Sequence, residues 1–304
     1  MAKYAIQASN LTKVYKDKAV VKNVSLAIKE GEIYGFIGKN GAGKTTVMRL
    51  IGGLAAPDSG EIAIFGSSGK KELVNARKNM GCLIESPSFY GNMTALENME
   101  IRRLQLGLEP KELSEDALIK VGLDPKDHKK VKNFSLGMKQ RLGIAVALIG
   151  EPKLLMLDEP INGLDPAGIV EIRDLLLELN RRGVTIFISS HILGELTKLA
   201  GVYGVIANGK MVDQFTVSQL QTRLAKAVKI GCADSLGVIR VLENVLGTKN
   251  YKMTNGYVYL YDFTDNVPFV MKSLVDNNVI PTELSLTEDD PESYFLKLME
   301  GGEK

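Results

Sequence analysis

Short apolar runs alternate with amphipathic stretches over most of the first 218 or so residues. Glu32–Ile37, Leu154–Leu157 and Val184–Ile188 are mainly apolar, which is typical of parallel strands that are covered on both faces. Lys44–Ile51 follows the first run, and Ala167–Arg181 follows the second, with the spacing of helices. This alternation of strands and helices predicts an α/β domain.

The apolar period changes at two places within this part of the chain. Tyr4–Ala8 and Val24–Lys29 predict strands near the N-terminus. Between about residues 86 and 150 the period is helical, and it predicts a largely helical insert with helices at Ala95–Leu106, Ser114–Val121 and Leu136–Ile149.

A fresh set of elements begins after about residue 218. Their order predicts a separate small α+β domain of ferredoxin-like type. We therefore divide the chain into residues 1–218 and residues 219–304. The elements expected in the second part are a strand at Ala227–Gly231, a helix at Leu236–Leu246, a hairpin at Asn255-Gly256, a helix at Val267–Asn277, a strand at Val279–Leu286 and a helix at Pro291–Met299.

Composition narrows the class of protein. The 304 residues are 45% hydrophobic and 24% charged, as in an ordinary globular protein. The net charge of +2 gives no overall field that would gather nucleic acid. Two distant cysteines favour a reduced, cytosolic setting. The longest apolar stretch, Leu142–Ile149, is far short of the ~20 residues of a membrane helix, so any membrane-spanning part must come from another chain.

Gly38–Thr45 fits the pattern of a phosphate-binding loop, with glycine, four residues and then Gly-Lys-Thr between a predicted strand and a predicted helix. Its glycines let backbone N–H groups face phosphate oxygens, and the helix N-terminus adds its positive dipole end. Lys44 would reach the β- and γ-phosphates, and Thr45 would hold Mg²⁺. The alternative is a chance glycine-rich turn. The nucleotide-binding residues predicted here are Gly38, Lys39, Asn40, Gly41, Ala42, Gly43, Lys44, Thr45 and Thr46.

The apolar run Leu154–Leu157 ends in two adjacent carboxylates, Asp158 and Glu159. They would lie at the edge of the sheet where α/β proteins bind their ligands. Asp158 is placed to hold Mg²⁺, directly or through water, and Glu159 to orient and deprotonate an attacking water. The alternative is a strand that ends in a solvated acidic turn.

A second phosphate-binding end is predicted at Ser135, which is a good N-cap for the helix that follows it. The Ser135 hydroxyl, the Gly137 N–H and the helix dipole together suit an anion. Because the chain already has one such end, the second suggests a site shared between two copies. An ordinary capped helix is the alternative.

Together these motifs resemble those of the ATP-binding subunit of an ABC transporter. Gly38–Thr45 and Leu154–Glu159 match the two Walker motifs, and Ser135–Arg141 resembles the family signature, usually read as Leu-Ser-Gly-Gly-Gln. Gly163–Pro166 matches the D-loop, and His191 matches the switch histidine. The motifs follow the family order over residues 4 to about 215.

Further positions refine the resemblance. Tyr15 sits where the family has its adenine-stacking aromatic residue, and a plain hairpin aromatic is the alternative. Leu136 and Met138 replace a glycine and a glutamine of the signature, and Glu85 stands in place of the Q-loop glutamine. This pattern, together with the long C-terminal extension, resembles the ATPase subunits of bacitracin-resistance and lantibiotic-immunity exporters.

The resemblance implies a fold, a setting and a function. The fold is that of a P-loop NTPase, with a RecA-like core, an N-terminal antiparallel β subdomain and a helical subdomain at about 86–150, followed by the small α+β domain. The setting is peripheral, at the cytoplasmic face of the membrane. The function is ATP hydrolysis that powers export of a peptide antibiotic or similar amphipathic substrate through a separate membrane (permease) subunit.

The resemblance also implies a head-to-tail homodimer with two ATP molecules, each with Mg²⁺, between the protomers. Lys44 and Glu159 of one copy would face Ser135 and Gly137 of the other. His191 would contact the γ-phosphate and hold Glu159 and the water in line, unless it is only a strand-end histidine with a structural hydrogen bond. Asp165 would cross the interface; otherwise it is a helix cap ahead of Pro166.

Glu85 and the aromatic residues that follow it carry separate hypotheses. A carboxylate only accepts hydrogen bonds, so we expect Glu85 to contact the metal shell rather than the γ-phosphate; a solvated loop acid is the alternative. Phe89 and Tyr90 lie in a predicted loop, Ser86–Gly91, where the resemblance places the groove for the membrane subunit. Alternatively, both rings are tucked into the helical insert.

Two other classes of protein remain to be weighed. A soluble ABC ATPase that acts on DNA or the ribosome usually has a long coiled coil or a second cassette, and neither is found here. A GTPase or kinase with a P-loop would leave Ser135–Arg141 unexplained, and the base-reading Asn-Lys-x-Asp motif of GTPases is absent. Transport is therefore favoured, and no nucleic acid partner is expected.

Overall fold

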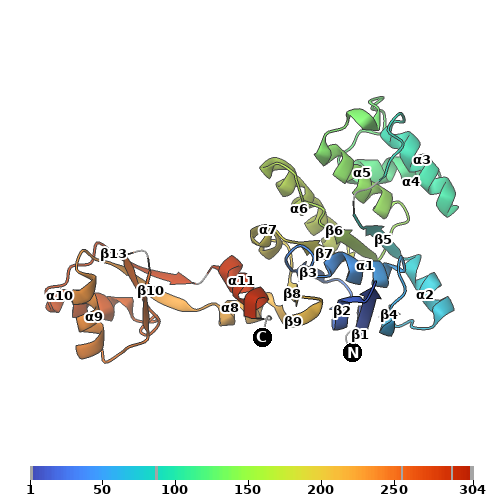
Figure 1. The fold of residues 1–304 in the computed structure, drawn as a ribbon. Coiled ribbons are helices and arrows are strands. Elements are labelled where there is room, and N and C mark those ends of the chain that lie inside the picture. Colours follow the sequence, from blue (N-terminus) through green and yellow to red (C-terminus); the bar gives the residue numbers. More distant parts are fainter. Residues whose placement is uncertain (1–2, 86–87, 255, 289, 302–304) are drawn as a thin grey trace. The chain divides into compact units, whose positions relative to one another are not determined.

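The computed structural model (Figure 1) describes residues 3–85, 88–254, 256–288 and 290–301. These form two compact units. The first contains the described residues up to Val217 together with those from Phe295 on, and the second is Ser218–Tyr294. The sequence-based division placed all of 219–304 in one domain, whereas in the structure the last residues belong to the first unit.

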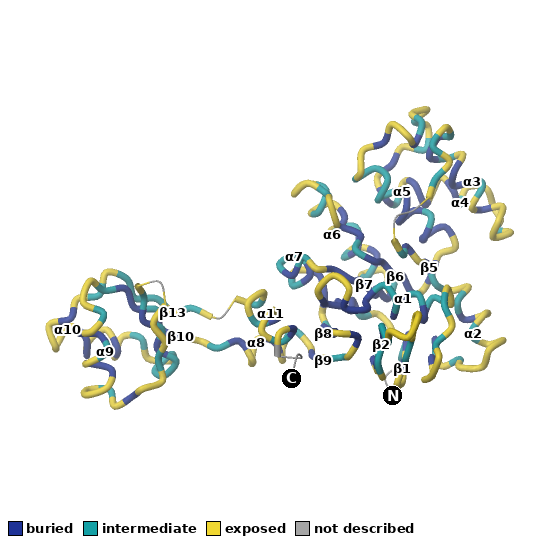
Figure 2. Tube along the Cα trace, viewed as in Figure 1, coloured by how far each residue is buried: buried dark blue, intermediate teal, exposed yellow. Residues whose placement is uncertain are grey.

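A six-stranded sheet forms the centre of the first unit, with the order β5-β6-β7-β3-β8-β9. The first five strands run parallel, and β9 pairs antiparallel with β8. Every residue of β3, β6 and β7 is buried (Figure 2), as predicted from their apolar runs. The bounds are β3 Ile33–Ile37, β5 Met80–Leu83, β6 Leu154–Asp158, β7 Thr185–Ser190, β8 Val202–Ala207 and β9 Lys210–Thr216.

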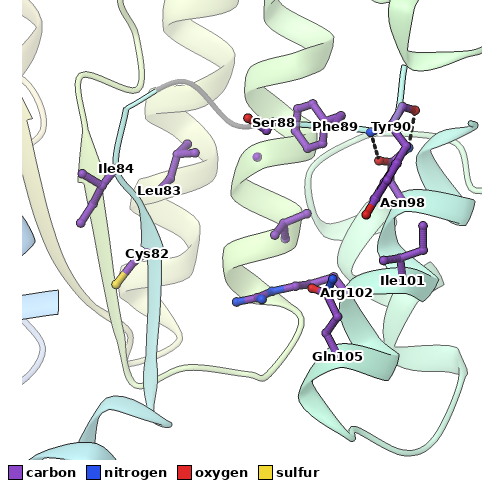
Figure 3. Close-up of a pocket in the computed structure, with 12 residues that line it drawn as sticks. Cys82, Leu83, Ile84, Ser88, Phe89, Tyr90, Asn98, Ile101, Arg102 and Gln105 are labelled. Carbon is purple, nitrogen blue, oxygen red and sulfur yellow. Dashed lines mark hydrogen bonds between the residues drawn. The ribbon is translucent and has the colours of Figure 1, made fainter. Parts of the chain in front are cut away.

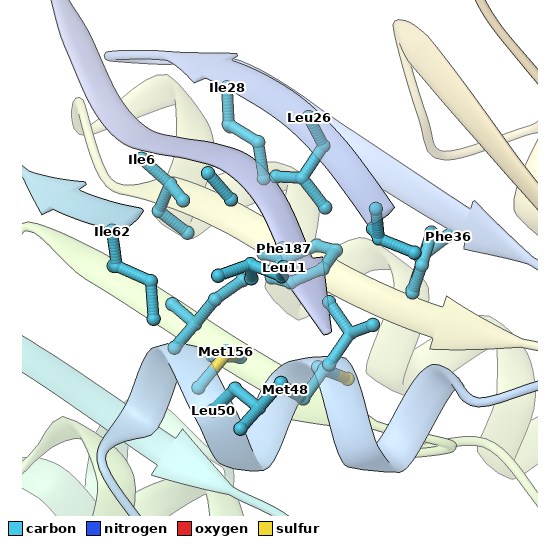
Figure 4. Packing of buried hydrophobic residues seen from close by; sticks show 14 of the residues in the cluster. Ile6, Leu11, Leu26, Ile28, Phe36, Met48, Leu50, Ile62, Met156 and Phe187 are labelled. Carbon is cyan, nitrogen blue, oxygen red and sulfur yellow. The ribbon is translucent and has the colours of Figure 1, made fainter. Parts of the chain in front are cut away.

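A three-stranded antiparallel sheet, with the order β2-β1-β4, packs over the helix α1. Between the two sheets lies an apolar core in which Ile6 and Ile28 approach Phe187, Met156 and side chains of α1 (Figure 4). This core holds α1 against the strand ends that carry the polar residues of the site. The bounds are β1 Tyr4–Tyr15, β2 Lys18–Lys29, α1 Lys44–Gly52, β4 Ser59–Ile64 and α2 Lys70–Arg77.

The predicted helical insert lies between β5 and β6 in the chain. Thr94 and Glu97 form a capping box at its first helix, in which each side chain bonds the backbone of the other residue. α5 packs against β5 and so joins the insert to the sheet. The bounds are α3 Ala95–Leu106, α4 Glu112–Lys120, the 3-10 helix η1 Val131–Asn133 and α5 Leu136–Leu148; α6 Pro166–Arg181 and the short α7 Leu193–Thr197 follow later, and the sequence had not predicted α7.

The second unit has the predicted ferredoxin-like order of elements. Its four strands form one antiparallel sheet in the order β11-β12-β10-β13, and α9 and α10 bury their apolar residues with it. The predicted Asn255-Gly256 turn lies between β11 and β12; Asn255 itself is outside the described residues. The bounds are α8 Val217–Arg223, β10 Lys226–Gly231, α9 Ser235–Asn244, β11 Tyr251–Thr254, β12 Tyr257–Leu260, α10 Val267–Asp276 and β13 Glu283–Glu288.

The last helix, α11 (Pro291–Gly301), anchors the end of the chain to the first unit. The Phe295 side chain is fully buried there. Its ring lies 5.4 Å from that of Tyr203 on β8 and 5.9 Å from that of Phe215 on β9, measured between centroids. Aromatic contacts of this kind add about 0.5–1.5 kcal/mol beyond the burial of area.

We predict that Phe295→Ala lowers the free energy of unfolding of the first unit by about 3–5 kcal/mol, because it leaves a cavity between α11 and the paired strands β8 and β9. Leu296→Ala, at the exposed neighbouring position, is the matched control and should cost less than about 1 kcal/mol. Denaturant unfolding of both variants checks the prediction. Equal losses in the two would contradict the anchoring role of α11.

Candidate active site

The loop between β3 and α1 forms a cradle whose shape depends on glycine. A Cβ built on Gly38 would lie 2.6 Å from the carbonyl oxygen of Ile206, and one on Gly43 would lie 3.0 Å from that of Val20. Gly43 also has a φ of 110°, a conformation that favours glycine. No side chain caps α1, so its first N–H groups remain available for an anion. The cradle encloses a cavity of about 180 Å³ lined by Val20, Lys39, Asn40, Gly41, Ala42, Gly43, Lys44, Thr45, Thr46 and Glu159.

Lys44 brings a nearly buried positive charge into this cavity, with only 6% of its side chain exposed. Its Nζ donates to the Gly38 carbonyl oxygen at 2.6 Å. The same Nζ lies 3.2 Å from Glu159 Oε1, but Oε1 is a buried oxygen without a hydrogen bond. The site therefore holds a cation and a cradle of N–H groups, and a phosphate group fits both.

Asp158 and Thr45 form the oxygen cluster that was predicted to hold Mg²⁺. Thr45 Oγ1 donates to Asp158 Oδ2 at 2.6 Å, and Ser189 Oγ donates to Asp158 Oδ1 at 2.5 Å. Mg²⁺ prefers one or two protein oxygens together with phosphate oxygens and water, and these donors fit that preference. Ser189, opposite Asp158 in the β6–β7 register, was missed by sequence reasoning; a hydroxyl at the end of the apolar run 184–188 was the available signal.

Glu159 and His191 meet at the ends of the neighbouring strands β6 and β7. His191 Nδ1 lies 2.8 Å from Glu159 Oε2, and the His191 backbone N–H donates to the same oxygen at 3.3 Å. The Glu159 backbone has a φ of 51°, which is uncommon for a residue other than glycine. Its N–H donates to Ser189 Oγ at 3.0 Å. His191 thus holds the Oε2 side of the carboxylate and Lys44 lies against Oε1, which fixes its orientation as a general base requires.

Glu85 does not join the cluster that was predicted to hold Mg²⁺. Its Oε1 instead accepts a hydrogen bond from Arg49 Nη2 at 2.6 Å. Arg49 lies one turn beyond Thr45 on α1. Among the contacts of the described residues, none joins Glu85 to Thr45 or Asp158. A role for Glu85 at the metal would therefore require it to leave Arg49.

Ser135 and Asp165 begin helices, and neither lines the cavity around Lys44 in its own chain. Ser135 Oγ accepts a hydrogen bond from the Met138 N–H at 3.2 Å, which caps α5. Asp165 Oδ1 accepts one from the Gly168 N–H at 3.1 Å, which caps α6. Both residues thus form the helix caps named as alternatives, and contact with a second copy remains a prediction.

Tyr15 lies at the exposed end of β1 and does not line the cavity either. Lys13 Nζ lies 5.4 Å from the centroid of its ring. Asp58 fixes this strand end: the Val14 N–H and Lys13 Nζ donate to it at 2.7 and 3.0 Å. These bonds, first that of Val14 and then that of Lys13, lower the pKa of Asp58 below its usual value. The ring is therefore held in the open, where a flat ligand can stack.

A second cavity, of about 490 Å³, lies between β5 and the helices α3 and α5 (Figure 3). Phe89 and Tyr90 both line it. The Asn98 side chain fixes the backbone of Tyr90 through two hydrogen bonds of 2.9 and 3.2 Å, and the Tyr90 side chain stays exposed. Ser86 and Pro87 of the predicted loop lie outside the described residues.

Fold and site together define a P-loop ATPase cassette, and comparison with known proteins gives its family. The ABC transporter family model matches residues 21–162. The bacitracin transport ATP-binding protein BcrA of Enterococcus faecalis is 40% identical over 98% of this chain and 97% of its own length. The lantibiotic transport ATP-binding protein SrtF of Streptococcus pyogenes is 44% identical over 68% of this chain and 89% of its own length.

Solved structures of similar fold belong to the same family. An ATP-binding subunit of an ABC transporter, 28% identical, superposes with a TM-score of 0.64 over 72% of this chain and 92% of its own. A dimeric ATP-binding cassette in a post-hydrolysis state with ADP and Pi, 27% identical, has a TM-score of 0.64 over 70% and 98%. The chain belongs to the ATP-binding subunits of ABC transporters. It is an ATPase.

None of the helices in the described residues is both long enough and apolar enough to cross a bilayer.

We predict that Gly38→Ala weakens nucleotide binding at least about tenfold, or about 1.4 kcal/mol, because the added Cβ would meet backbone and force the loop to move. Gly201→Ala is the control: nothing lies within 4 Å of its added Cβ. Calorimetric titration with ATP measures both. Wild-type affinity in the Gly38 variant would contradict the cradle described above.

Proposed function

We propose that this ATPase powers export of a peptide antibiotic or a similar amphipathic compound through a separate membrane subunit. Relatives named for bacitracin, lantibiotic and linearmycin transport or resistance support the substrate class. The observation that carries the ATP-driven part of the proposal, a nucleotide site shared between two copies, is the separation of the two phosphate-binding ends: Lys44 lines the loop cavity, whereas Ser135 caps a helix outside it.

Two copies arranged head to tail would complete each nucleotide site. In such a dimer the loop cavity of one copy faces Ser135 and Gly137 of the other, with ATP between them. The γ-phosphate then touches both copies, and ADP cannot bridge them. Nucleotide state thereby biases an equilibrium between a closed dimer and separated cassettes. A solved relative that is dimeric in a post-hydrolysis state supports the pairing of two cassettes.

Hydrolysis in this site follows from the contacts at the sheet edge. Thr45 and Asp158 would hold Mg²⁺, which neutralises charge on the β- and γ-phosphates. Lys44 binds the phosphates from the other side. Glu159 orients the attacking water and accepts its proton. His191, bonded to the Glu159 carboxylate, keeps that base in line and contacts the γ-phosphate.

Recognition of adenine and of the metal would involve two further residues. Tyr15 is placed to stack on the adenine ring, since its own ring is exposed at the end of β1. Glu85 would reach the metal shell only after the Arg49 ion pair opens. An exposed pair of this kind is worth about 0–1 kcal/mol, so a bound cation can displace Arg49.

The groove lined by Phe89 and Tyr90 is the proposed contact with the membrane subunit, which would place the protein at the cytoplasmic face of the membrane. An exposed aromatic side chain beside an open cavity is a suitable anchor for a partner. Residues of β5, α3 and α5 line this groove. When two cassettes close on each other, these elements would move and would carry with them a membrane subunit bound in the groove.

We predict that Glu159→Gln reduces ATP turnover at least about 100-fold, because the amide cannot accept the proton of the water. ATP binding should persist, and ATP should now hold the protein as a stable dimer. Turnover assays and light scattering with and without ATP measure these effects. Glu178→Gln, on the exposed face of α6, is the matched control.

A Glu159→Gln protein that binds ATP and stays monomeric would overturn the shared site.

We also predict that Tyr90→Ala and Phe89→Ala reduce co-purification with the membrane subunit several-fold while ATP affinity is unchanged. Removal of either ring takes away an anchor of the groove without altering the phosphate cavity. Affinity capture from detergent-solubilised membranes, after co-expression, measures assembly. Ile119→Ala, exposed on α4 and outside the groove, is the control. Full assembly of both ring variants would contradict the docking site.

A further inference from the structure

The two helix caps that would face a second copy are packed together within one chain. Leu136, at the start of α5, stands where the family signature has a glycine. A Cβ built on Gly163 would lie 2.9 Å from Leu136 Cδ2, and Gly163 has a φ of 74°. The end of the leucine side chain therefore lies against a loop position that has no side chain of its own.

The packing is reciprocal. Gly163 and Leu164 lead into Asp165, the cap of α6. Leu164 Cδ2 lies 3.8 Å from the place of a Cβ on Gly137, the residue next to Leu136. Each segment thus sets a leucine against a glycine of the other. The contact is local to the two helix starts, where both segments carry their polar groups.

A second contact joins the same two helices farther along. Arg141 on α5 pairs with Glu171 on α6, and its other Nη atom donates to the Val121 carbonyl oxygen at 2.7 Å. The Arg141 side chain is 19% exposed and the Glu171 side chain 58% exposed, so water reaches the carboxylate end of the pair more than the guanidinium end. Two contacts, one apolar and one ionic, therefore join α5 to α6.

Leu136 is nevertheless 52% exposed. An exposed leucine that bridges two polar helix starts adds little to the core of its own chain. Its position is suited to setting the distance between Ser135 and Asp165 instead.

We propose that Leu136 and Arg141 are positioning residues that unite the Ser135–Gly137 helix start and the Gly163–Asp165 loop into one surface. In the dimer this surface would face the nucleotide bound to the second copy. The polar groups of the helix start and those of the loop would then reach that nucleotide together. The inference rests on the proposed shared site. It adds that Leu136, in place of the signature glycine, couples the helix start to the loop.

The first experiment measures ATP-dependent dimerisation in the Glu159→Gln background by sedimentation. Leu136→Ala should raise the dimer dissociation constant about tenfold, with the affinity of each protomer for ATP and the melting temperature unchanged. Leu104→Ala, which removes a leucine that is also largely exposed, from α3, should leave dimerisation at the Glu159→Gln level. If Glu159→Gln alone fails to dimerise, the proposed function fails; if it dimerises and the two leucine variants match, only the coupling role fails.

The second experiment tests whether the defect acts on the other copy. Lys44→Ala lacks the cation of the phosphate cavity and keeps the surface around Leu136, whereas Leu136→Ala has the reverse defect. A mixture of the two should form one sound composite site and dimerise with ATP more strongly than either variant alone. A mixture no better than its components would overturn the proposal.

The ionic contact has its own test. In the Glu159→Gln background, Arg141→Glu should weaken the ATP-dependent dimer several-fold, and addition of Glu171→Arg should restore most of it by reversing the pair. A loss in the single variant that the reversed pair does not recover would overturn the role of Arg141 in joining α5 to α6.

Discussion

A lysine ammonium that is almost out of reach of water controls the arrangement of this site. Removal of a charge from water costs several kcal/mol unless partners compensate, and Lys44 finds the Gly38 carbonyl and the Glu159 carboxylate. That requirement fixes the loop, the start of α1 and the end of β6 relative to one another. In the proposed cycle the phosphates take over the partnership with Lys44, and Glu159 is then free to act on water.

The strands make this arrangement possible because the polar residues that follow β6 and β7 lie at the same edge of the sheet. β6 and β7 are buried along their whole length, and their polar residues begin where the apolar ones end. Backbone pairing sets Asp158 opposite Ser189, so a hydroxyl orients the carboxylate that faces Thr45. α1 is pressed against the same edge by the core beneath the three-stranded sheet. The site is thus a product of sheet register as much as of its motif residues.

The catalytic edge could be predicted from the sequence because Asp158 and Glu159 directly follow an apolar run, and parallel strands end at the same side of a sheet. Ser189 was missed although its hydroxyl directly follows an apolar run, and the role of Arg49 had no local signal, because the partners of both residues are remote in the chain. Ser189 is 31 residues from Asp158, and Arg49 is 36 residues from Glu85. The α/β fold class was predictable from periodicity. The packing of α11 against the first unit was not, because the sequence around Phe295 does not show which strands this side chain contacts.

That return makes the cassette a discontinuous domain, with Ser218–Tyr294 inserted into it rather than appended to it. Both ends of the inserted unit are covalently continuous with the cassette. A premature stop codon after Val217 would therefore remove a core side chain as well as the accessory unit. A minimal cassette is better obtained by internal excision, with a short linker that joins Val217 to the residues just before Phe295, than by shortening the gene from its end.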